Sequence, residues 1–140
     1  MAAKEVERFG MKPRAALLSH SNFGNHETKS SVKMAKTKEL LSKMAPELEV
    51  DGEMKGGMAL NPSVRNKSDI CSLTGNANLL IMPNLDAANI TYTVLKALAN
   101  GISVGPIILG VDMPIHAITK ATTPRGIVNL TCLVASSVED

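Results

Sequence analysis

Aromatic side chains are nearly absent from this 140-residue sequence, which has no tryptophan, one tyrosine and two phenylalanines. Proteins that bind single-stranded nucleic acid stack bases on aromatic rings, so this scarcity argues against that class. The net charge of +2 is too small to indicate a nucleic-acid or membrane partner. The core must therefore be built from leucine, isoleucine, valine, alanine and the eight methionines.

Long apolar segments are also missing. Residues 1–7 contain no apolar stretch of the kind that a secretory signal has. The apolar run 102–109 is far shorter than a membrane-spanning helix, and it contains Gly105 and Pro106. We therefore expect a cytoplasmic protein without a membrane partner.

Metal and redox motifs are lacking as well. Cys71 and Cys132 match no metal-binding or redox spacing, and we interpret them as two buried thiols in a reducing compartment. His20, His26 and His116 do not follow a metal-ligand pattern, so no metal site is expected in this segment. The Walker loop, the G-x-G-x-x-G motif and the G-x-S-x-G elbow are absent from the sequence.

Short apolar runs alternate with helical patterns along the chain. The predicted strands are 15–19, 49–53, 78–82 and 102–109. The predicted helices are a helix end over 2–9 closed by Gly10, and helices that begin at a Ser30 or Ser31 cap, at Pro62, at an Asp86 cap and at Pro124. A glycine-rich turn is expected at 56–57.

This alternation predicts an α/β fold, a three-layer α/β/α arrangement with a mostly parallel sheet. We expect a helix end from a preceding segment over 1–12 and one α/β domain over 13–140. The last helix is apolar on nearly all faces, which is typical of a buried helix. We therefore expect part of it to contact another subunit or a missing domain, as in a homo-oligomer.

Candidate ligand-binding residues follow the predicted strands, because ligands gather at the carboxyl ends of parallel strands. Lys29, Lys33 and Lys36 add positive charge after the first of these loops. Each group also has an ordinary structural interpretation as loop, turn or helix cap. The candidates are Ser19, Ser21, Asn22 and Gly24; Asn84, Asp86 and Asn89; Gly105 and Pro106; and Thr119 and Lys120.

Several stretches together resemble a known family. They are SHSNFG over 19–24, MPNLDAANI over 82–90, VGPIILG over 104–110 and RGIVN over 125–129. In this order they are similar to the second lobe and closing helix of the phosphate acetyl/butyryl transferases, from about residue 13 to the end. The sequences of these segments are closer still to the phosphotransacetylase-like tail of bacterial NADP-dependent malic enzymes, which they resemble.

The resemblance implies a parent oxidoreductase that uses NADP and a divalent metal, Mg or Mn, with no cofactor in this segment. It implies a tail that binds acetyl-CoA, or a similar acyl-CoA or phosphorylated metabolite, and that helps the oligomer to assemble. The transferases carry a serine, an arginine and an aspartate for acyl transfer. The matching positions here are Thr119, Lys120 and Gly126. Lysine lacks the bidentate fork of arginine, and glycine cannot accept a thiol proton.

Three functions remain open. The first, which we favour, is a catalytically degenerate module that senses acetyl-CoA and supports assembly. The second is an active fragment of a phosphate acetyltransferase or butyryltransferase. The third is a purely structural lobe for oligomerisation with a disused pocket.

Overall fold

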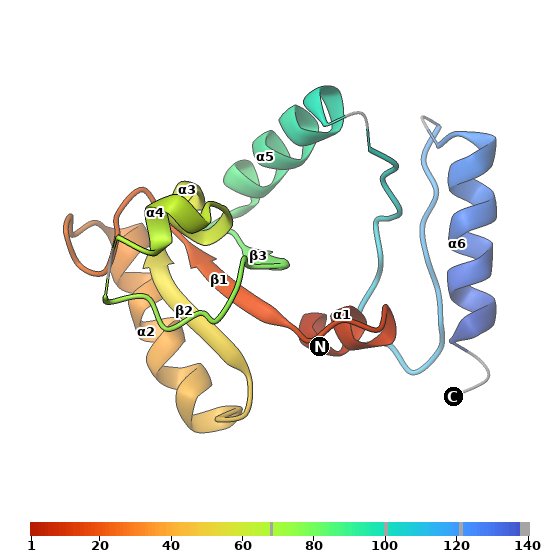
Figure 1. The fold of residues 1–140 in the computed structure, drawn as a ribbon. Coiled ribbons are helices and arrows are strands. Elements are labelled where there is room, and N and C mark those ends of the chain that lie inside the picture. The colour runs from red at the N-terminus through yellow and green to blue at the C-terminus, as the bar shows by residue number, and fades with distance from the viewer. Residues whose placement is uncertain (68, 100, 121, 138–140) are drawn as a thin grey trace. The chain divides into compact units, whose positions relative to one another are not determined.

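The computed structural model describes residues 1–67, 69–99, 101–120 and 122–137. The chain divides into two compact units, Ala2–Thr91 and the part from Tyr92 onward together with Met1, and each is described by itself. The expected domain limits, 1–12 and 13–140, stay a prediction. The elements, shown in Figure 1, are α1 (Ala2–Arg8), β1 (Arg14–Leu18), α2 (Lys29–Met44), β2 (Glu49–Met54), α3 (Gly56–Leu60), α4 (Pro62–Arg65), β3 (Leu79–Ile81), α5 (Leu85–Leu98) and α6 (Pro124–Ser136).

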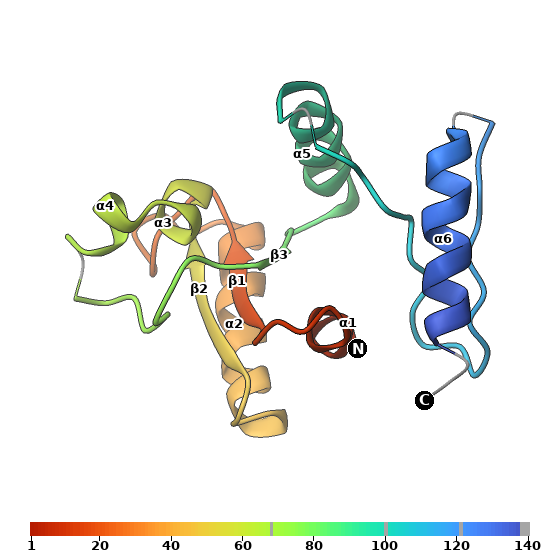
Figure 2. The ribbon, with the colours of Figure 1, turned by 45° about the vertical axis from the view of Figure 1, so that its right-hand side comes forward.

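A parallel sheet organises the first unit. In the described residues it has the strand order β2-β1-β3, with β1 pairing in parallel with both neighbours. Figure 2 shows the strands of the sheet, with α2 lying along β1 and β2. The predicted α/β class with a parallel sheet is therefore confirmed, and the strands predicted at 15–19, 49–53 and 78–82 correspond to β1, β2 and β3.

Both faces of the central strand β1 are covered. Side chains alternate along a strand, so Ala16 and Leu18 point to one face and Ala15 and Leu17 to the other. Ala16 and Leu18 belong to a buried cluster with Met54, with Met58 and Ala59 of α3, and with Leu73 and Ala77. Helix α2 packs against β1 and β2. All four apolar residues of β1 are buried, as a continuous apolar strand predicts.

Gly52 marks a close approach between β2 and β1. Its φ is +136°, and a Cβ built there would lie 2.6 Å from the Leu17 carbonyl oxygen. The register between the two strands shifts just beyond this point, because Leu17 faces Gly52 whereas Leu18 faces Met54. Only glycine combines this backbone conformation with this closeness.

Carboxylates at every second residue of β2 hold loops against the sheet. Glu49 Oε1 accepts the Thr74 N–H at 2.7 Å, and Glu53 Oε1 accepts the Gly24 N–H at 2.8 Å. Between them, Asp51 is fully buried and accepts the Ser72 N–H at 2.6 Å.

Two helix starts differ from the prediction. Helix α2 begins at Lys29, with Thr28 as its cap, and Ser31 completes a reciprocal capping box instead of being the cap itself. At α5 the cap is Asn84, whose side-chain oxygen accepts the Ala87 N–H at 2.9 Å, so Asp86 lies in the first turn. Both predictions chose a good capping residue, but an equally good one stands two or three positions earlier.

Other predicted ends are confirmed. Gly10 closes α1 with φ +73°, where its N–H bonds to Glu7 and the next N–H to Val6. Asn61 caps α4 through the Ser63 N–H, and Thr123 and Pro124 begin α6. The expected turn at 56–57 is instead the first turn of α3.

The run 102–109 is not a strand, contrary to the prediction. In the part of the chain that the structure describes, it has no neighbouring strand to pair with. Pro106 also lacks the N–H that a ladder requires. Its apolar side chains are largely exposed in this chain, including Ile102 and Ile108.

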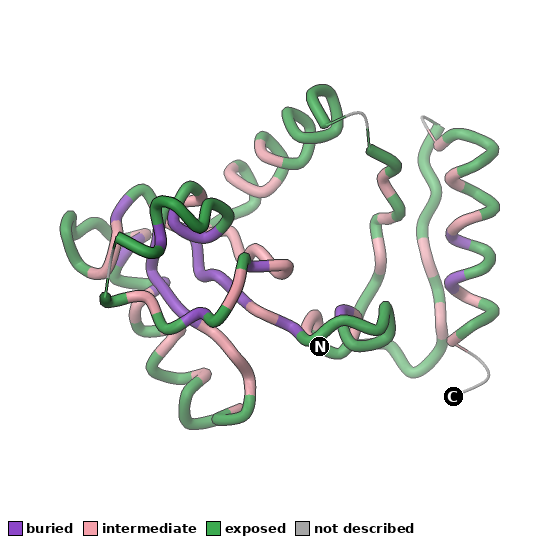
Figure 3. Tube along the Cα trace, in the orientation of Figure 1, coloured by how far each residue is buried: buried purple, intermediate pink, exposed green. Residues whose placement is uncertain are grey.

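Helix α6 is less buried than its composition predicts. Leu130 and Leu133 are buried, whereas Ile127 and Val128 are exposed, as the mostly green and pink trace of α6 in Figure 3 shows. The expected contact with another subunit or domain stays a prediction. The expectation of two buried thiols is wrong as well, because Cys71 is half-buried and Cys132 is exposed on α6. Cys132 is exposed because only the side of α6 that carries Leu130 and Leu133 is buried. None of the described helices combines the length and the hydropathy needed to cross a membrane.

Candidate functional site

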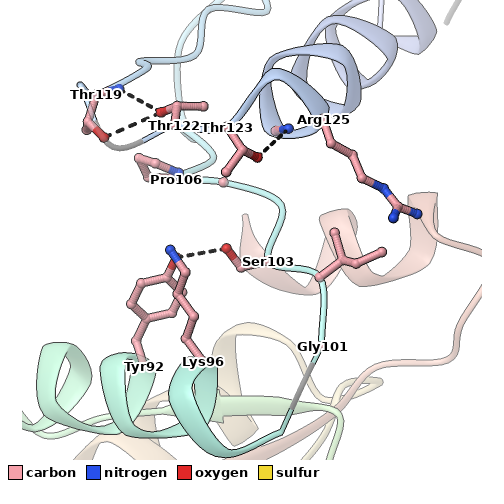
Figure 4. Close-up of a pocket in the computed structure, with 12 residues that line it drawn as sticks. Tyr92, Lys96, Gly101, Ser103, Pro106, Thr119, Thr122, Thr123 and Arg125 are labelled. Atoms are coloured by element: carbon pink, nitrogen blue, oxygen red, sulfur yellow. Dashed lines mark hydrogen bonds between the residues drawn. The ribbon is translucent and has the colours of Figure 1, made fainter.

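A hollow of about 430 Å³ lies within the unit that begins at Tyr92. Its walls come from the last turns of α5, the irregular segment 101–106 and the first turn of α6 (Figure 4). The lining residues are Tyr92, Lys96, Gly101, Ile102, Ser103, Gly105, Pro106, Thr119, Thr122, Thr123, Arg125 and Gly126.

Hydroxyl groups organise the wall at the start of α6. The Thr123 side chain accepts the Gly126 N–H at 3.1 Å and so caps the helix. Thr122 accepts the Thr119 N–H at 2.9 Å, which fixes the turn before the helix. Because the first amides of a helix point out along its axis, this wall presents a partial positive charge to the hollow.

The opposite wall is formed by α5. The hydroxyl oxygens of Tyr92 and Ser103 lie 3.0 Å apart in a hydrogen bond. The Lys96 ammonium lies 5.9 Å from the centroid of the Tyr92 ring, within the range of a cation–π contact. Figure 4 shows both side chains rising from α5 toward Ser103.

The charge of the hollow has one sign. Lys96 and Arg125 are its two cations, five lining residues carry hydroxyls, and none of the described lining residues is a carboxylate. Figure 4 shows Arg125 extending from the first turn of α6. Cations, hydroxyl donors and a helix N-terminus together suit a phosphate or another anion.

A smaller hollow of about 210 Å³ shares most of the α5 wall. Leu95 joins Tyr92, Lys96 and Ile102 in its lining, so an apolar surface adjoins the cationic one. The arrangement can therefore receive a ligand that joins an anionic group to an apolar or aromatic one.

Three of the residues predicted from the sequence line this hollow, namely Gly105, Pro106 and Thr119. Lys120 is exposed and is not part of the lining. The sequence interpretation missed Tyr92, Lys96 and Arg125. A tyrosine and a lysine four residues apart on one helix face were the signal that could have found two of them.

The loop after β1 uses its polar groups locally. The buried Ser21 hydroxyl accepts the His26 N–H at 3.0 Å, and the Asn22 side chain accepts the Lys55 N–H at 2.7 Å. The Gly24 N–H donates to Glu53, and the Ser19 hydroxyl accepts the Ser21 N–H at 3.3 Å. These groups satisfy backbone partners, and their role in ligand binding stays a prediction.

The remaining candidates surround the start of α5. Asn84 serves as its cap, and Asp86 and Asn89 are exposed on the helix. They belong to the unit Ala2–Thr91, as do the residues of the loop after β1. Among the lysines that follow the loop after β1, Lys33 donates a hydrogen bond to the Pro83 carbonyl. In the described ranges no three His, Cys, Asp or Glu residues gather as a metal site would require.

Comparison with known proteins gives a consistent result. The sequence pattern of the family "Phosphate acetyl/butaryl transferase" matches residues 1–135. The chain is 48% identical over 134 residues to the NAD-dependent malic enzyme of Rhizobium meliloti, and 48% identical over 135 residues to the NADP-dependent malic enzyme of Escherichia coli. The EutD phosphotransacetylase of Staphylococcus aureus has a similar structure, with a TM-score of 0.87 and 31% identity.

These matches cover nearly all of this chain but only part of each relative. They include 95% of this chain against 17% and 18% of the two malic enzymes. For the staphylococcal structure the shares are 96% and 42%. The chain thus spans less than a fifth of the length of the malic enzymes that it matches, and it corresponds to their C-terminal part.

Proposed function

The chain belongs to the phosphate acetyl/butaryl transferase family, and we propose that its hollow binds acetyl-CoA or a similar acyl-CoA or phosphorylated metabolite. The observation that carries this proposal is the charge of the hollow. Lys96 and Arg125 face a hollow lined by hydroxyls and by the start of α6, without a carboxylate among the described lining residues. An anionic phosphate gains hydrogen bonds and charge there.

The site acts as a sensor and not as a catalyst in this proposal. Acyl transfer to CoA needs a group that accepts the thiol proton, and the reverse transfer needs the same group to return it. Gly126 stands where the resemblance to the transferases expects an aspartate, and the other lining residues that the structure describes supply no carboxylate. A Cβ at this position would lie 3.1 Å from Thr122 Cγ2 and 3.4 Å from Thr123 Oγ1. An aspartate there would therefore press on the Thr122 methyl group, which would have to move slightly to make room.

The surrounding protein is a cytoplasmic malic enzyme in this proposal. The two relatives at 48% identity are named as NAD- and NADP-dependent malic enzymes. The parent would thus be an oxidoreductase that oxidises malate with a nicotinamide coenzyme and a divalent metal, Mg or Mn. Those groups would bind outside this segment.

Assembly is the second part of the proposed role. Helix α5 has no buried residue, and Ile90, Val94 and Leu98 on it are exposed. Exposed apolar surface of this extent is typical of a face that contacts another chain or domain. Regulation follows if acetyl-CoA binds two states of the assembled enzyme with different affinity, since only differential binding shifts an equilibrium.

An active phosphate acyltransferase is the alternative function. The 31% identity to a phosphotransacetylase over nearly the whole chain favours it. An assay that follows acetyl-CoA formation from acetyl phosphate and CoA separates the two functions. We expect no activity above background from this chain, and turnover that disappears in an Arg125→Gln variant would establish the transferase.

Calorimetric titration of the protein with acetyl-CoA tests the proposal. We expect saturable binding that weakens about tenfold or more in Arg125→Gln and in Lys96→Met, because each loses a charge-assisted hydrogen bond. Lys43→Met, which removes an exposed lysine near the end of α2, is the matched control and should bind like the wild type. Absence of saturable binding in the wild type would refute the proposed function.

A further inference from the structure

Tyr92 connects two parts of the hollow, helix α5 and the segment 101–106. The segment 101–106 supplies five of the twelve lining residues, yet it is neither helix nor strand. No regular ladder of backbone hydrogen bonds therefore fixes its course, and Gly105 with φ +138° adds backbone freedom. The hydrogen bond of 3.0 Å between the Tyr92 and Ser103 hydroxyls ties this segment to α5.

The same residue contacts the lysine of the site. Tyr92 and Lys96 are four residues apart, so they lie one above the other on α5. The Lys96 ammonium lies 5.9 Å from the centroid of the Tyr92 ring. A lysine side chain is long and flexible, and a contact that limits its rotamers reduces the entropy lost when it binds an anion.

We propose that Tyr92 is the positioning residue of this site, a role that rests on the proposed binding of an anionic ligand. Its hydroxyl holds Ser103, and with it the segment 101–106, at the distance from α5 that forms the hollow. Its ring holds the Lys96 ammonium where the ligand's phosphate enters. Tyr92 acts through these two neighbours and takes no part in any chemical step.

The composition of the chain makes this role measurable. Tyr92 is the one tyrosine of the sequence, and tryptophan is absent. All tyrosine emission of the protein therefore comes from Tyr92, at the wall of the hollow, without a background from other positions. Inorganic phosphate is the suitable probe for fluorescence, because the adenine of acetyl-CoA absorbs where tyrosine is excited.

The first step of the test is a titration of the full chain with inorganic phosphate, followed by tyrosine emission, and with acetyl-CoA, followed by calorimetry. Saturable changes with both ligands place the anion beside Tyr92. Binding of acetyl-CoA without any change of tyrosine emission on phosphate addition would overturn the positioning role. Absence of binding in both titrations would refute the proposed function, and this inference with it.

The second step separates the hydroxyl from the ring. Tyr92→Phe and Ser103→Ala each remove the same hydrogen bond, so each should weaken acetyl-CoA binding about threefold to tenfold. The double variant should lose no more than either single variant, because the bond can be lost only once. Tyr92→Leu also removes the ring, and a further loss of about threefold is expected, which phenylalanine rescues.

The control is Ser42→Ala on α2, an exposed serine of the other unit, which should leave binding unchanged. Thermal unfolding followed by circular dichroism should give the same midpoint for Tyr92→Phe as for the wild type, so that a loss of affinity reports on the site. Wild-type affinity in Tyr92→Phe, or losses that add in the double variant, would overturn this inference while leaving the proposed function intact.

Discussion

The buried carboxylate of Asp51 makes the stability of the first unit depend on a lysine of α2. Asp51 is fully buried, and the Lys38 ammonium donates to its Oδ1. The Gly52 N–H donates to the same oxygen at 2.9 Å, and the Ser72 N–H donates to Oδ2 at 2.6 Å. Replacing Lys38 by methionine would keep the side-chain length and leave the carboxylate without its counter-charge.

We expect Lys38→Met to lower the free energy of unfolding by about 3 kcal/mol at neutral pH. Removing one partner of a buried ion pair costs roughly 3–5 kcal/mol, because the other charge stays desolvated. The lower end applies for two reasons. Asp51 keeps two backbone donors, and the Lys38 side chain is itself 37% exposed, so water screens part of the attraction. Urea denaturation followed by circular dichroism measures the difference.

The effect of pH gives a second check. Burial acts to raise the pKa of Asp51, but the Lys38 ammonium and the Ser72 and Gly52 N–H groups outweigh it, so the pKa lies below the ordinary 3.8. A carboxyl with a lowered folded pKa stabilises the fold above its unfolded pKa, and this stability is lost as the pH falls. The difference between wild type and Lys38→Met should therefore shrink below about pH 3.8.

A second lysine of α2 provides a matched control for Lys38. Lys36→Met on the same helix removes an exposed lysine and should change stability by less than about 0.5 kcal/mol. Adding Asp51→Asn to Lys38→Met should recover part of the loss, because the buried site then carries no net charge. Equal stability of the Lys38→Met and Lys36→Met variants, or a difference that does not change with pH, would refute the argument.

Three further predictions concern other parts of the chain. Gly52→Ala should destabilise the protein by about 3 kcal/mol in urea denaturation, because its Cβ would lie 2.6 Å from the Leu17 carbonyl oxygen; a loss below about 1 kcal/mol would contradict this. Asn84→Ala should cost about 1 kcal/mol by removing the α5 cap, whereas Asn84→Asp should cost little. Cys132, exposed on α6, should react with a thiol reagent before Cys71, whose pKa is raised chiefly by burial; Cys132→Ser should abolish the fast phase.

The strands of the first unit could be predicted because each has a short sequence pattern that is typical of a strand. The run that forms β1 is short, apolar and followed by a polar loop, which is the pattern of a strand buried on both faces. The run 102–109 has a similar composition but is not a strand. A strand needs a partner, and composition does not say whether a neighbouring strand is available.

The site could be predicted only where a residue stands out from its surroundings. Gly105 and Pro106 were found because a glycine permits a ligand to approach the backbone closely, and Thr119 because its hydroxyl stands beside a cation just before the last helix. Tyr92 and Lys96 were missed because they lie on a helix whose pattern is that of an ordinary amphipathic face. In the loop after β1, by contrast, the sequence suggested ligand-binding residues whose side chains have other partners. Its polar residues look free to bind an anion, but Ser21 and Asn22 already bond to backbone groups.

The carboxylates of β2 also lead us to expect an order in which parts of the first unit fold. Glu53 bonds to Gly24, 29 residues earlier, whereas Asp51 bonds to Ser72, 21 residues later. Each bond closes a long loop, so it becomes favourable only after β2 has docked on β1 and its charges are fixed in place. We therefore expect the segments that contain Gly24 and Ser72 to become ordered only after β2 has docked on β1.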